Sequence, residues 1–132
     1  NVDYIMILNN DTAVPPNMLK KLVNVFSRKK NVGFCGPVEY SYLNPYDVQS
    51  AGGKIGLYTG YHKYISTVSG NIETVEWLSG SCILIRKKGI LDVGCFDERY
   101  FLYVEEVDYA YRMTKYGYKV CVTPETSIWH KG

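Results

Sequence analysis

The stretch that decides the fold runs from Phe101 to His130 and reads FLYVEEVDYAYRMTKYGYKVCVTPETSIWH. Its first half predicts a helix. Four residues occupy positions i, i+3, i+4 and i+7, the spacing of one helix face: Glu105, Asp108, Tyr109 and Arg112. We expect Gly117 to end this helix, since glycine adopts the left-handed conformation without a steric penalty. The apolar run Val120–Val122 then predicts a buried strand, which Pro124 should end.

Two adjacent carboxylates, Glu105 and Glu106, open this helix. Acidic side chains are stabilised at a helix N-terminus by the helix dipole, and that alone would explain the pair. A carboxylate held at a helix N-terminus and facing a cleft is also well placed to act as a general base. Mutual repulsion of the pair should raise one pKa. The polar residues after the first strand and His130 at the end of the stretch favour the catalytic interpretation.

The first strand is the continuous apolar run Tyr4–Leu8, a pattern typical of a strand covered on both faces in a parallel sheet. It ends in Asn9, Asn10 and Asp11. Open α/β sheets bind ligands beyond the carboxyl ends of their strands. The side-chain oxygens of this segment could hold a hard cation, although the same three residues would also suit an ordinary turn.

A strand–helix–strand unit follows from the next segment. An amphipathic helix is predicted over Met18–Lys29, with an apolar stripe of Leu19, Leu22, Val23 and Phe26. A second buried strand, Val32–Cys35, should end at Gly36 and Pro37, and a right-handed parallel crossover is the usual connection. A further short helix is expected over Lys87–Val93.

The middle of the chain, Val38–Gly70, is rich in glycine and tyrosine and predicts short strands with long connections. A long connection in a compact domain is usually functional, so we expect a flap that faces the substrate. Trp77, Ser79 and Gly80 precede the predicted strand Cys82–Ile85. Glycine here would let the backbone approach a ligand closely, or would simply form a tight turn.

Composition sets limits on function. The 132 residues suit a single domain, and a net charge of +2 is too small to predict nucleic-acid binding. The four cysteines lack zinc-site spacing and predict free thiols in the cytosol. No apolar run approaches the ~20 residues of a membrane span. Thirteen tyrosines would suit the recognition of sugars. Because the chain begins at Asn1, directly before a strand, we expect it to be part of a longer protein.

Four blocks, taken in order, carry a resemblance to a known family. Leu8–Asp11 stands where that family has its DxD metal motif, and Trp77–Arg86 matches a strand on the acceptor side. Gly94–Glu98 with Phe101–Arg112 matches its ED-x-D helix, and Gly117–Gly132 matches its closing strand with a metal-site histidine. The chain thus resembles the second half of the inverting glycosyltransferase family 2, and within it the rhamnosyltransferase-like members.

This resemblance implies a GT-A-like (Rossmann-like) α/β fold, with a mixed, mostly parallel sheet flanked by helices. Residues 1–132 would form a single domain that lacks the N-terminal nucleoside-binding strands, roughly 60–90 residues at ~30 per unit. The implied reaction transfers a sugar from a nucleotide-diphosphate sugar to a hydroxyl of a glycan or lipid-linked acceptor, with inversion. The resemblance implies a cytoplasmic protein, with peripheral association at the inner face of the membrane when full-length.

The resemblance also implies roles for individual residues. Asp11 and His130, with Asn9, would hold Mg²⁺ or Mn²⁺, and Glu106 would be the general base, with Glu105 as the alternative. Substrate contacts are implied at Asn9, Asn10, Trp77, Ser79, Gly80 and Asp108, although the spacing of Asp108 and Arg112 also suits a structural ion pair. Two residues depart from the family pattern, since Asn9 and Glu106 each replace an aspartate.

Two other functions remain open from the residues. Paired carboxylates also catalyse the reaction of glycoside hydrolases. That reaction needs no metal, so a hydrolase function would not explain Asp11 and His130. A non-catalytic carbohydrate-binding module would account for the aromatic residues but not for the carboxylates at the helix N-terminus. For the isolated chain we expect no transferase activity, weak donor binding and self-association through an exposed sheet edge.

Overall fold

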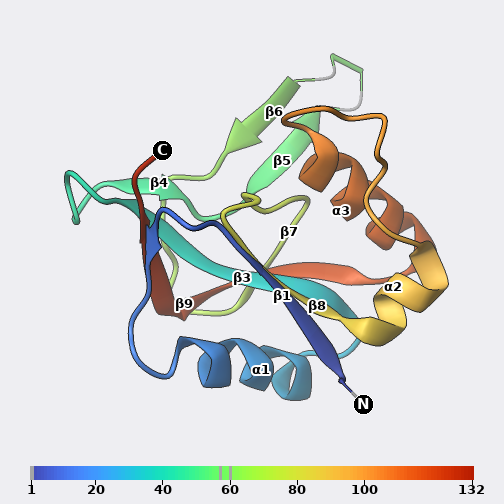
Figure 1. Cartoon of the computed structure of the whole chain (residues 1–132), viewed down its shortest axis with the longest axis horizontal. Helices are drawn as coiled ribbons and strands as arrows, with labels where there is room; N and C mark the ends of the chain where they lie inside the picture. The colour runs from blue at the N-terminus through green and yellow to red at the C-terminus, as the bar shows by residue number, and fades with distance from the viewer. Residues whose placement is uncertain (1, 57, 60) are drawn as a thin grey trace.

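The computed structural model describes residues 2–56, 58–59 and 61–132. The main sheet has seven strands in the order β1-β8-β3-β9-β2, with β4 beside β3 and β7 beside β9, and β5 and β6 form a separate hairpin (Figure 1). The strands are β1 (Tyr4–Leu8), β2 (Thr12–Ala13), β3 (Val32–Ser41), β4 (Val48–Ser50), β5 (Gly53–Gly56), β6 (Tyr61–Tyr64), β7 (Glu73–Val75), β8 (Cys82–Arg86) and β9 (Lys119–His130). The helices are α1 (Met18–Arg28), α2 (Lys87–Val93) and α3 (Glu105–Tyr116).

The sheet is mixed, but the expectation of mostly parallel pairing was wrong. Only β3 and β9 pair in parallel among the described strands, and the other pairs are antiparallel. Strand β8 lies between β1 and β3 and runs opposite to both. β1 and β3 therefore point the same way, as a β1–α1–β3 crossover requires, yet they do not touch. Buried apolar runs do not specify the direction of a neighbouring strand.

Strands β3 and β9 continue past the prolines that were expected to end them. Between Pro37 and Val38 the register shifts, so that Pro37 faces Thr123 while Val38 faces Ser127. The extra residues of β9, including Pro124, form a bulge that accommodates a residue without a backbone N–H. The bulge lets both strands run on, and it brings the ends of β3 and β9 to the same edge of the sheet.

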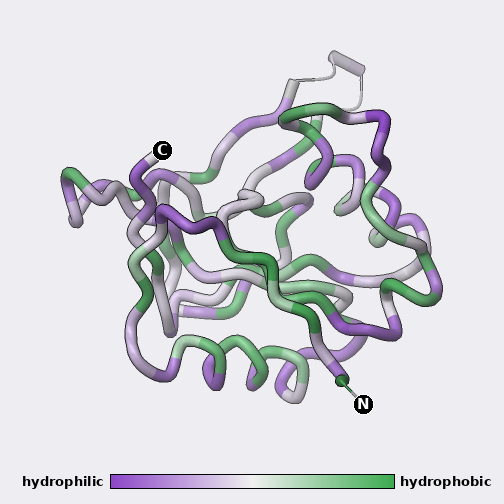
Figure 2. The backbone as a smooth tube through the Cα atoms, viewed as in Figure 1, coloured by the Kyte–Doolittle hydropathy of each residue, from purple (hydrophilic) through white to green (hydrophobic). Residues whose placement is uncertain are grey.

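Successive residues of the central strands point to opposite faces of the sheet, and each face has its own core. On one face α1 packs through residues such as Leu22 and Phe26 against Cys35 and Leu84. On the other face α3 packs against a cluster that includes Phe34, Ile83, Val120 and Trp77. Figure 2 shows hydrophobic segments along the strands at the centre of the sheet and hydrophilic residues at the C-terminal end of the chain.

Strand β1 is not covered on both faces, in contrast to the prediction from its apolar run. It is the terminal strand of the sheet order, and Ile5 and Leu8 are each about two-fifths exposed (41% and 42%). The only described partner of β1 is β8, so the outer backbone edge of β1 is unpaired within the described part of the chain. Exposed edges of this kind favour association with another strand.

The predicted flap is in part a folded hairpin anchored on Trp77. Gly53 in β5 packs directly against the indole, and the N–H of Gly53 donates to the carbonyl of Trp77 at 3.0 Å. The ring of Tyr64 in β6 meets the indole edge-on, with centroids 4.7 Å apart. The Nε1–H of Trp77 donates to the carbonyl of Lys54 at 3.3 Å. These contacts hold the β5–β6 hairpin against the hydrophobic core.

All four cysteines are free thiols, as predicted, and Cys35, Cys82 and Cys121 are buried in strands. Burial raises the pKa of the Cys82 thiol to about 12, so this group behaves as a small apolar side chain. No described helix is long and apolar enough to cross a membrane.

Candidate active site

One pocket of about 620 Å³ gathers most of the predicted site residues from distant parts of the chain. From the prediction it contains Asn9, Asp11, Ser79, Gly80, Glu105, Glu106 and His130, and it adds Glu39, Gln49, Ser50, Tyr64, Ser81, Leu102, Tyr103 and Gly132. These residues come from the turn after β1, from β3, β4, β6 and the end of β9, from the start of α3, and from the loops before β8 and α3. The fold thus brings together the polar strand ends and the helix carboxylates.

Asp11 and His130 face each other at one side of the pocket. The Nε2 atom of His130 lies 3.2 Å from Oδ1 of Asp11 and 3.5 Å from Nδ2 of Asn9. Antiparallel pairing of β2 with β9, in which Thr12 is opposite His130, fixes this approach. The hydroxyl of Thr12 donates to the carbonyl of Asn9 at 2.8 Å and closes the turn between β1 and β2. The residues of this turn are therefore the same ones that were predicted to hold a cation.

A buried carboxylate, Glu39, lies behind the histidine. Its Oε1 is 2.9 Å from Nδ1 of His130, and its Oε2 accepts a hydrogen bond from the hydroxyl of Ser81 at 2.7 Å. The hydroxyl of Ser79 donates to that of Ser81 at 3.1 Å. Sequence reasoning missed Glu39 because the predicted strand was ended at Pro37. The signal was an acidic residue directly after an apolar run, Gly36-Pro37-Val38-Glu39.

The donor atoms on this side of the pocket fit a divalent cation. A carboxylate, an imidazole nitrogen and an amide come from Asp11, His130 and Asn9. Oxygen ligands suit Mg²⁺ or Mn²⁺, and the single imidazole favours Mn²⁺. The other ring nitrogen of His130 contacts a carboxylate, as is common for histidines that bind metals. No cluster of three or more His, Cys, Asp or Glu suited to a metal occurs among the described residues. Water or substrate oxygens would have to complete the coordination.

The carboxylates of Glu105 and Glu106 line the pocket from the first turn of α3. Burial raises the pKa of Glu106, and the negative charge of Glu105 adds to the effect. The Oε2 atom of Glu105 is buried and has no hydrogen-bond partner among the described residues. Val104, which precedes the helix, has a φ of 71°, a conformation that is rare for a β-branched residue. The raised pKa of Glu106 suits a general base.

Three predicted substrate contacts lie outside the pocket. Trp77 is fully buried beneath the β5–β6 hairpin, so its indole supports the fold and cannot contact an acceptor here. Asn10 is exposed in the turn after β1 and does not line the pocket. Asp108 belongs to a different surface of α3, where it pairs with Arg112. All three lie close in sequence to residues that line the pocket, namely Asn9, Ser79 and Glu106.

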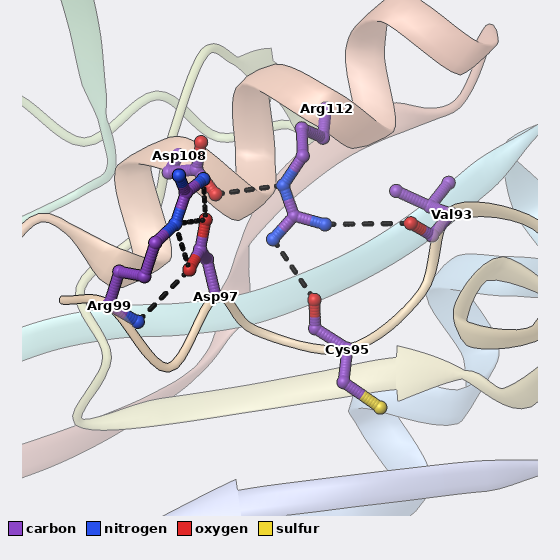
Figure 3. A network of polar contacts seen from close by, with 6 residues as sticks. All are labelled: Val93, Cys95, Asp97, Arg99, Asp108 and Arg112. Atoms are coloured by element: carbon purple, nitrogen blue, oxygen red, sulfur yellow. Dashed lines mark hydrogen bonds and ion pairs between the residues drawn. The ribbon is translucent and has the colours of Figure 1, made fainter.

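The ion pair of Asp108 and Arg112 is structural, as its spacing predicted. Nε of Arg112 donates to Oδ2 of Asp108 at 2.8 Å, and the guanidinium also donates to the carbonyl of Cys95 at 3.0 Å (Figure 3). Arg99 binds Asp97 through several hydrogen bonds in the same region and lowers the pKa of Asp97 to about 2. This network ties the segment between α2 and α3 to the helix that carries the carboxylates.

An aromatic and apolar wall was not predicted from the sequence. Tyr64 from β6 and the neighbours Leu102 and Tyr103 line the pocket near Glu106. Burial raises the pKa of the Tyr64 hydroxyl, with smaller effects from Glu106 and Glu39. Tyr103 is 73% exposed and Phe101 is 99% exposed, so this wall continues into an apolar surface loop. Aromatic faces beside polar groups are typical of sugar-binding surfaces.

Comparison with solved structures supports the fold. The chain is similar to a crystal structure of GalNAc-T7 with UDP, GalNAc and Mn²⁺, with a TM-score of 0.78 at 15% identity over 98% of this chain and 28% of that chain. It is also similar to A197 from STIV, with a TM-score of 0.64 at 10% identity over 97% of this chain and 57% of that chain. The predicted GT-A-like α/β fold is confirmed.

Comparison with known sequences identifies relatives. The chain is 29% identical to the N-acetylglucosaminyl-diphospho-decaprenol L-rhamnosyltransferase of Mycobacterium tuberculosis, over 97% of this chain and 47% of that protein. It is 32% identical to the O-antigen biosynthesis protein RfbC of Myxococcus xanthus, over 97% of this chain and 11% of that protein. The chain therefore spans about half the length of the first relative and a small part of the second.

The family model described as Glycosyl transferase family group 2 matches residues 4–132, which is nearly the whole chain. The matched region contains the polar turn after β1, both carboxylates of α3 and the histidine of β9. The chain belongs to glycosyl transferase family group 2.

Proposed function

We propose that this pocket belongs to an inverting glycosyltransferase that moves a sugar from a nucleotide-diphosphate sugar to a hydroxyl of a glycan or lipid-linked acceptor. One observation carries the proposal: the pocket holds a partly buried carboxylate, Glu106, together with the facing pair Asp11 and His130. A base for an attacking hydroxyl and a set of cation ligands are the two groups that such a transfer requires.

Glu106 would act on the acceptor. As the acceptor oxygen forms its bond to the anomeric carbon, the bond from that carbon to the diphosphate oxygen breaks, and Glu106 takes the hydroxyl proton. A single displacement of this kind inverts the configuration at the anomeric carbon. The partly buried position that raises the pKa of Glu106 also strengthens it as a proton acceptor. Glu105 lies beside it and is the alternative base.

Asp11, His130 and Asn9 would act on the donor side by holding Mg²⁺ or Mn²⁺. A divalent cation supplies positive charge that stabilises the diphosphate leaving group. A cation held by these three side chains would lie near the turn between β1 and β2, which the hydrogen bond from the Thr12 hydroxyl to the carbonyl of Asn9 stabilises. Ser79 and Gly80 lie on the wall of the same pocket and offer a hydroxyl and an unobstructed backbone.

The acceptor side would be formed by Tyr64, Leu102 and Tyr103. The mycobacterial relative, as its name states, is an N-acetylglucosaminyl-diphospho-decaprenol L-rhamnosyltransferase. We extend this to the present chain as a rhamnosyl or hexosyl transfer to a lipid-linked sugar. The exposed Phe101 and Leu102 next to the pocket would suit the apolar part of such an acceptor. The full-length protein would then work at the cytoplasmic face of the membrane, through peripheral association.

A turnover screen tests this function. The full-length protein is incubated with nucleotide-activated rhamnose and hexoses, Mn²⁺ and a prenyl-diphospho-N-acetylglucosamine acceptor, and the anomeric configuration of the product is read by NMR. We expect one donor to be consumed only when acceptor is present, with inverted configuration. Glu125→Gln, outside the pocket, serves as a matched control and should keep activity. Cleavage of glycans without any transfer would instead support a glycoside hydrolase.

A further inference from the structure

Glu39 is a buried acidic residue in a strand that is otherwise almost entirely apolar or small. The residue is only 6% exposed, and both carboxylate oxygens are engaged, one with His130 and one with Ser81. Burying a carboxylate costs free energy even when it is paired, and an apolar side chain of similar size often gives a more stable core. A role in the site would explain why an acidic residue occupies this position.

The contact with Nδ1 has a direct consequence for the other nitrogen of the ring. A carboxylate can only accept, so Nδ1 of His130 must carry the hydrogen in the 2.9 Å contact with Glu39. In the neutral imidazole, Nε2 is then left with its lone pair. This lone pair is directed to the side of the ring where Asp11 lies at 3.2 Å and Asn9 at 3.5 Å.

The lone pair of Nε2 and the carboxylate of Asp11 are both acceptors, and their separation of 3.2 Å suits two ligands of one cation. The carboxylate of Asp11 and the lone pair of His130 Nε2 would then form one half of a cation site, and Glu39 would decide which ring nitrogen belongs to it. Ser81 holds the second oxygen of Glu39 and so prevents rotation of the carboxylate away from the ring. The arrangement fixes both the tautomer and the orientation of the histidine.

We propose that Glu39 is a positioning residue that holds His130 in the Nδ1–H tautomer, so that Nε2 can bind a divalent cation together with Asp11. The proposal deepens the proposed function and rests on it for the presence of the cation. Glu39 itself does not touch the substrate in this account. Its effect is on the affinity for the cation, while the proton transfer by Glu106 is left intact.

Direct titration of Mn²⁺ into the full-length protein, followed by the electron paramagnetic resonance signal of the free ion, tests this role without any donor or acceptor. Outer groups that orient a ligating histidine typically contribute 10–100-fold to metal affinity, so Glu39→Gln should weaken Mn²⁺ binding by about that factor. Ser81→Ala, which leaves the contact between Glu39 and His130 in place, should give a smaller loss. Glu125→Gln, whose ion pair with Arg28 lies outside the pocket, should bind like the wild type.

Two further readouts separate positioning from a general loss of structure. The ¹⁵N shifts of His130, assigned by comparison with His130→Gln, should show the Nδ1–H tautomer in the wild type and a mixture in Glu39→Gln. In transfer assays, Glu39→Gln should need more Mn²⁺ for half-maximal rate but approach the wild-type kcat at saturation. These two changes would not follow from a purely structural role.

The outcomes are decisive in either direction. Unchanged Mn²⁺ affinity and an unchanged tautomer in Glu39→Gln would overturn the proposal, as would a wild type that does not bind Mn²⁺. If Glu39→Gln does not fold, the Ser81→Ala titration decides, and wild-type affinity in that variant would contradict the role. If Mn²⁺ binding depends on Glu39 but no sugar is transferred, the positioning role stands and the proposed function fails.

Discussion

Asp11, near the start of the chain, and His130, near its end, face each other with Oδ1 and Nε2 3.2 Å apart. The contact exists because the two-residue strand β2, which follows β1 after a short turn, pairs with the last residues of β9. The two segments that would bind a cation are therefore brought together only by the completed sheet. Any cation bound by these two segments would therefore be bound only by the folded state.

Activity of the full-length protein should require a divalent cation. We expect loss of transfer in excess chelator, recovery on addition of Mn²⁺ or Mg²⁺, and a sharp fall in Asp11→Ala and His130→Ala because the main ligands are removed. Asn10→Ala, whose side chain lies outside the pocket, is the matched control and should stay close to wild type. Full activity in excess chelator would show that the transfer does not need a divalent cation.

Glu106 should make the folded state less stable at neutral pH than a neutral residue would. Its pKa is raised above the ordinary value of 4.5, so between pH 4.5 and the raised pKa the folded state keeps a proton that the unfolded chain has lost. Stability therefore falls as pH rises through this window. The gain in unfolding temperature from Glu106→Gln should be larger at pH 7 than at pH 4. A difference that does not change with pH would contradict the raised pKa.

Added side-chain volume where the β5–β6 hairpin packs on Trp77 should destabilise the protein. A Cβ at Gly53 would lie 2.2 Å from the indole of Trp77, whereas nothing lies within 4 Å of a Cβ at Gly70. Overpacking of this kind typically costs about 1–3 kcal/mol. We expect Gly53→Ala to lower the free energy of unfolding by an amount in this range and Gly70→Ala to leave it nearly unchanged, as measured by denaturant titration. Equal stability of the two variants would argue against the packed hairpin.

Much of the fold could be predicted from periodicity and stop signals. Helices α2 and α3 and strand β1 have the predicted bounds, because each is a regular pattern bounded by glycine or by polar residues. Pairing direction could not be predicted, since a buried run such as Ile83–Ile85 looks the same beside a parallel or an antiparallel neighbour. The bulge that carries β9 past Pro124 depends on tertiary pairing with β3 and leaves no local signal.

Pocket residues that lie in short polar segments of the sequence could be predicted. Whether a side chain points into the pocket or into the core could not. Asp11, Glu105, Glu106 and His130 meet in one pocket, as the resemblance implied. Trp77 looked equally suitable, yet it points into the core because its strand neighbours place it beneath the hairpin. Glu39 was missed for the opposite reason, since it lies beyond a proline that the bulge allows the strand to pass.

The isolated chain should self-associate and bind donors poorly. Strand β1 has one edge without a partner among the described strands, with Ile5 and Leu8 partly exposed, and such edges promote association. We expect a mass above the monomer in light scattering and donor binding in the millimolar range or weaker in calorimetry with Mn²⁺. Ile5→Lys should reduce the self-association, while Leu19→Lys on the exposed side of α1 should not. A clean monomer that binds a donor with micromolar affinity would contradict this expectation.

If Glu106 at the start of α3 takes the acceptor proton, its replacement should slow the transfer step itself, which a comparison of kcat for Glu106→Gln and Glu105→Gln in the full-length protein measures. Loss of a general base typically costs ~10²–10⁴-fold in rate. We expect a loss of this size in Glu106→Gln with nearly unchanged donor binding, and a smaller effect in Glu105→Gln. A near-normal kcat in Glu106→Gln, together with a large loss in Glu105→Gln, would contradict the assignment of the base.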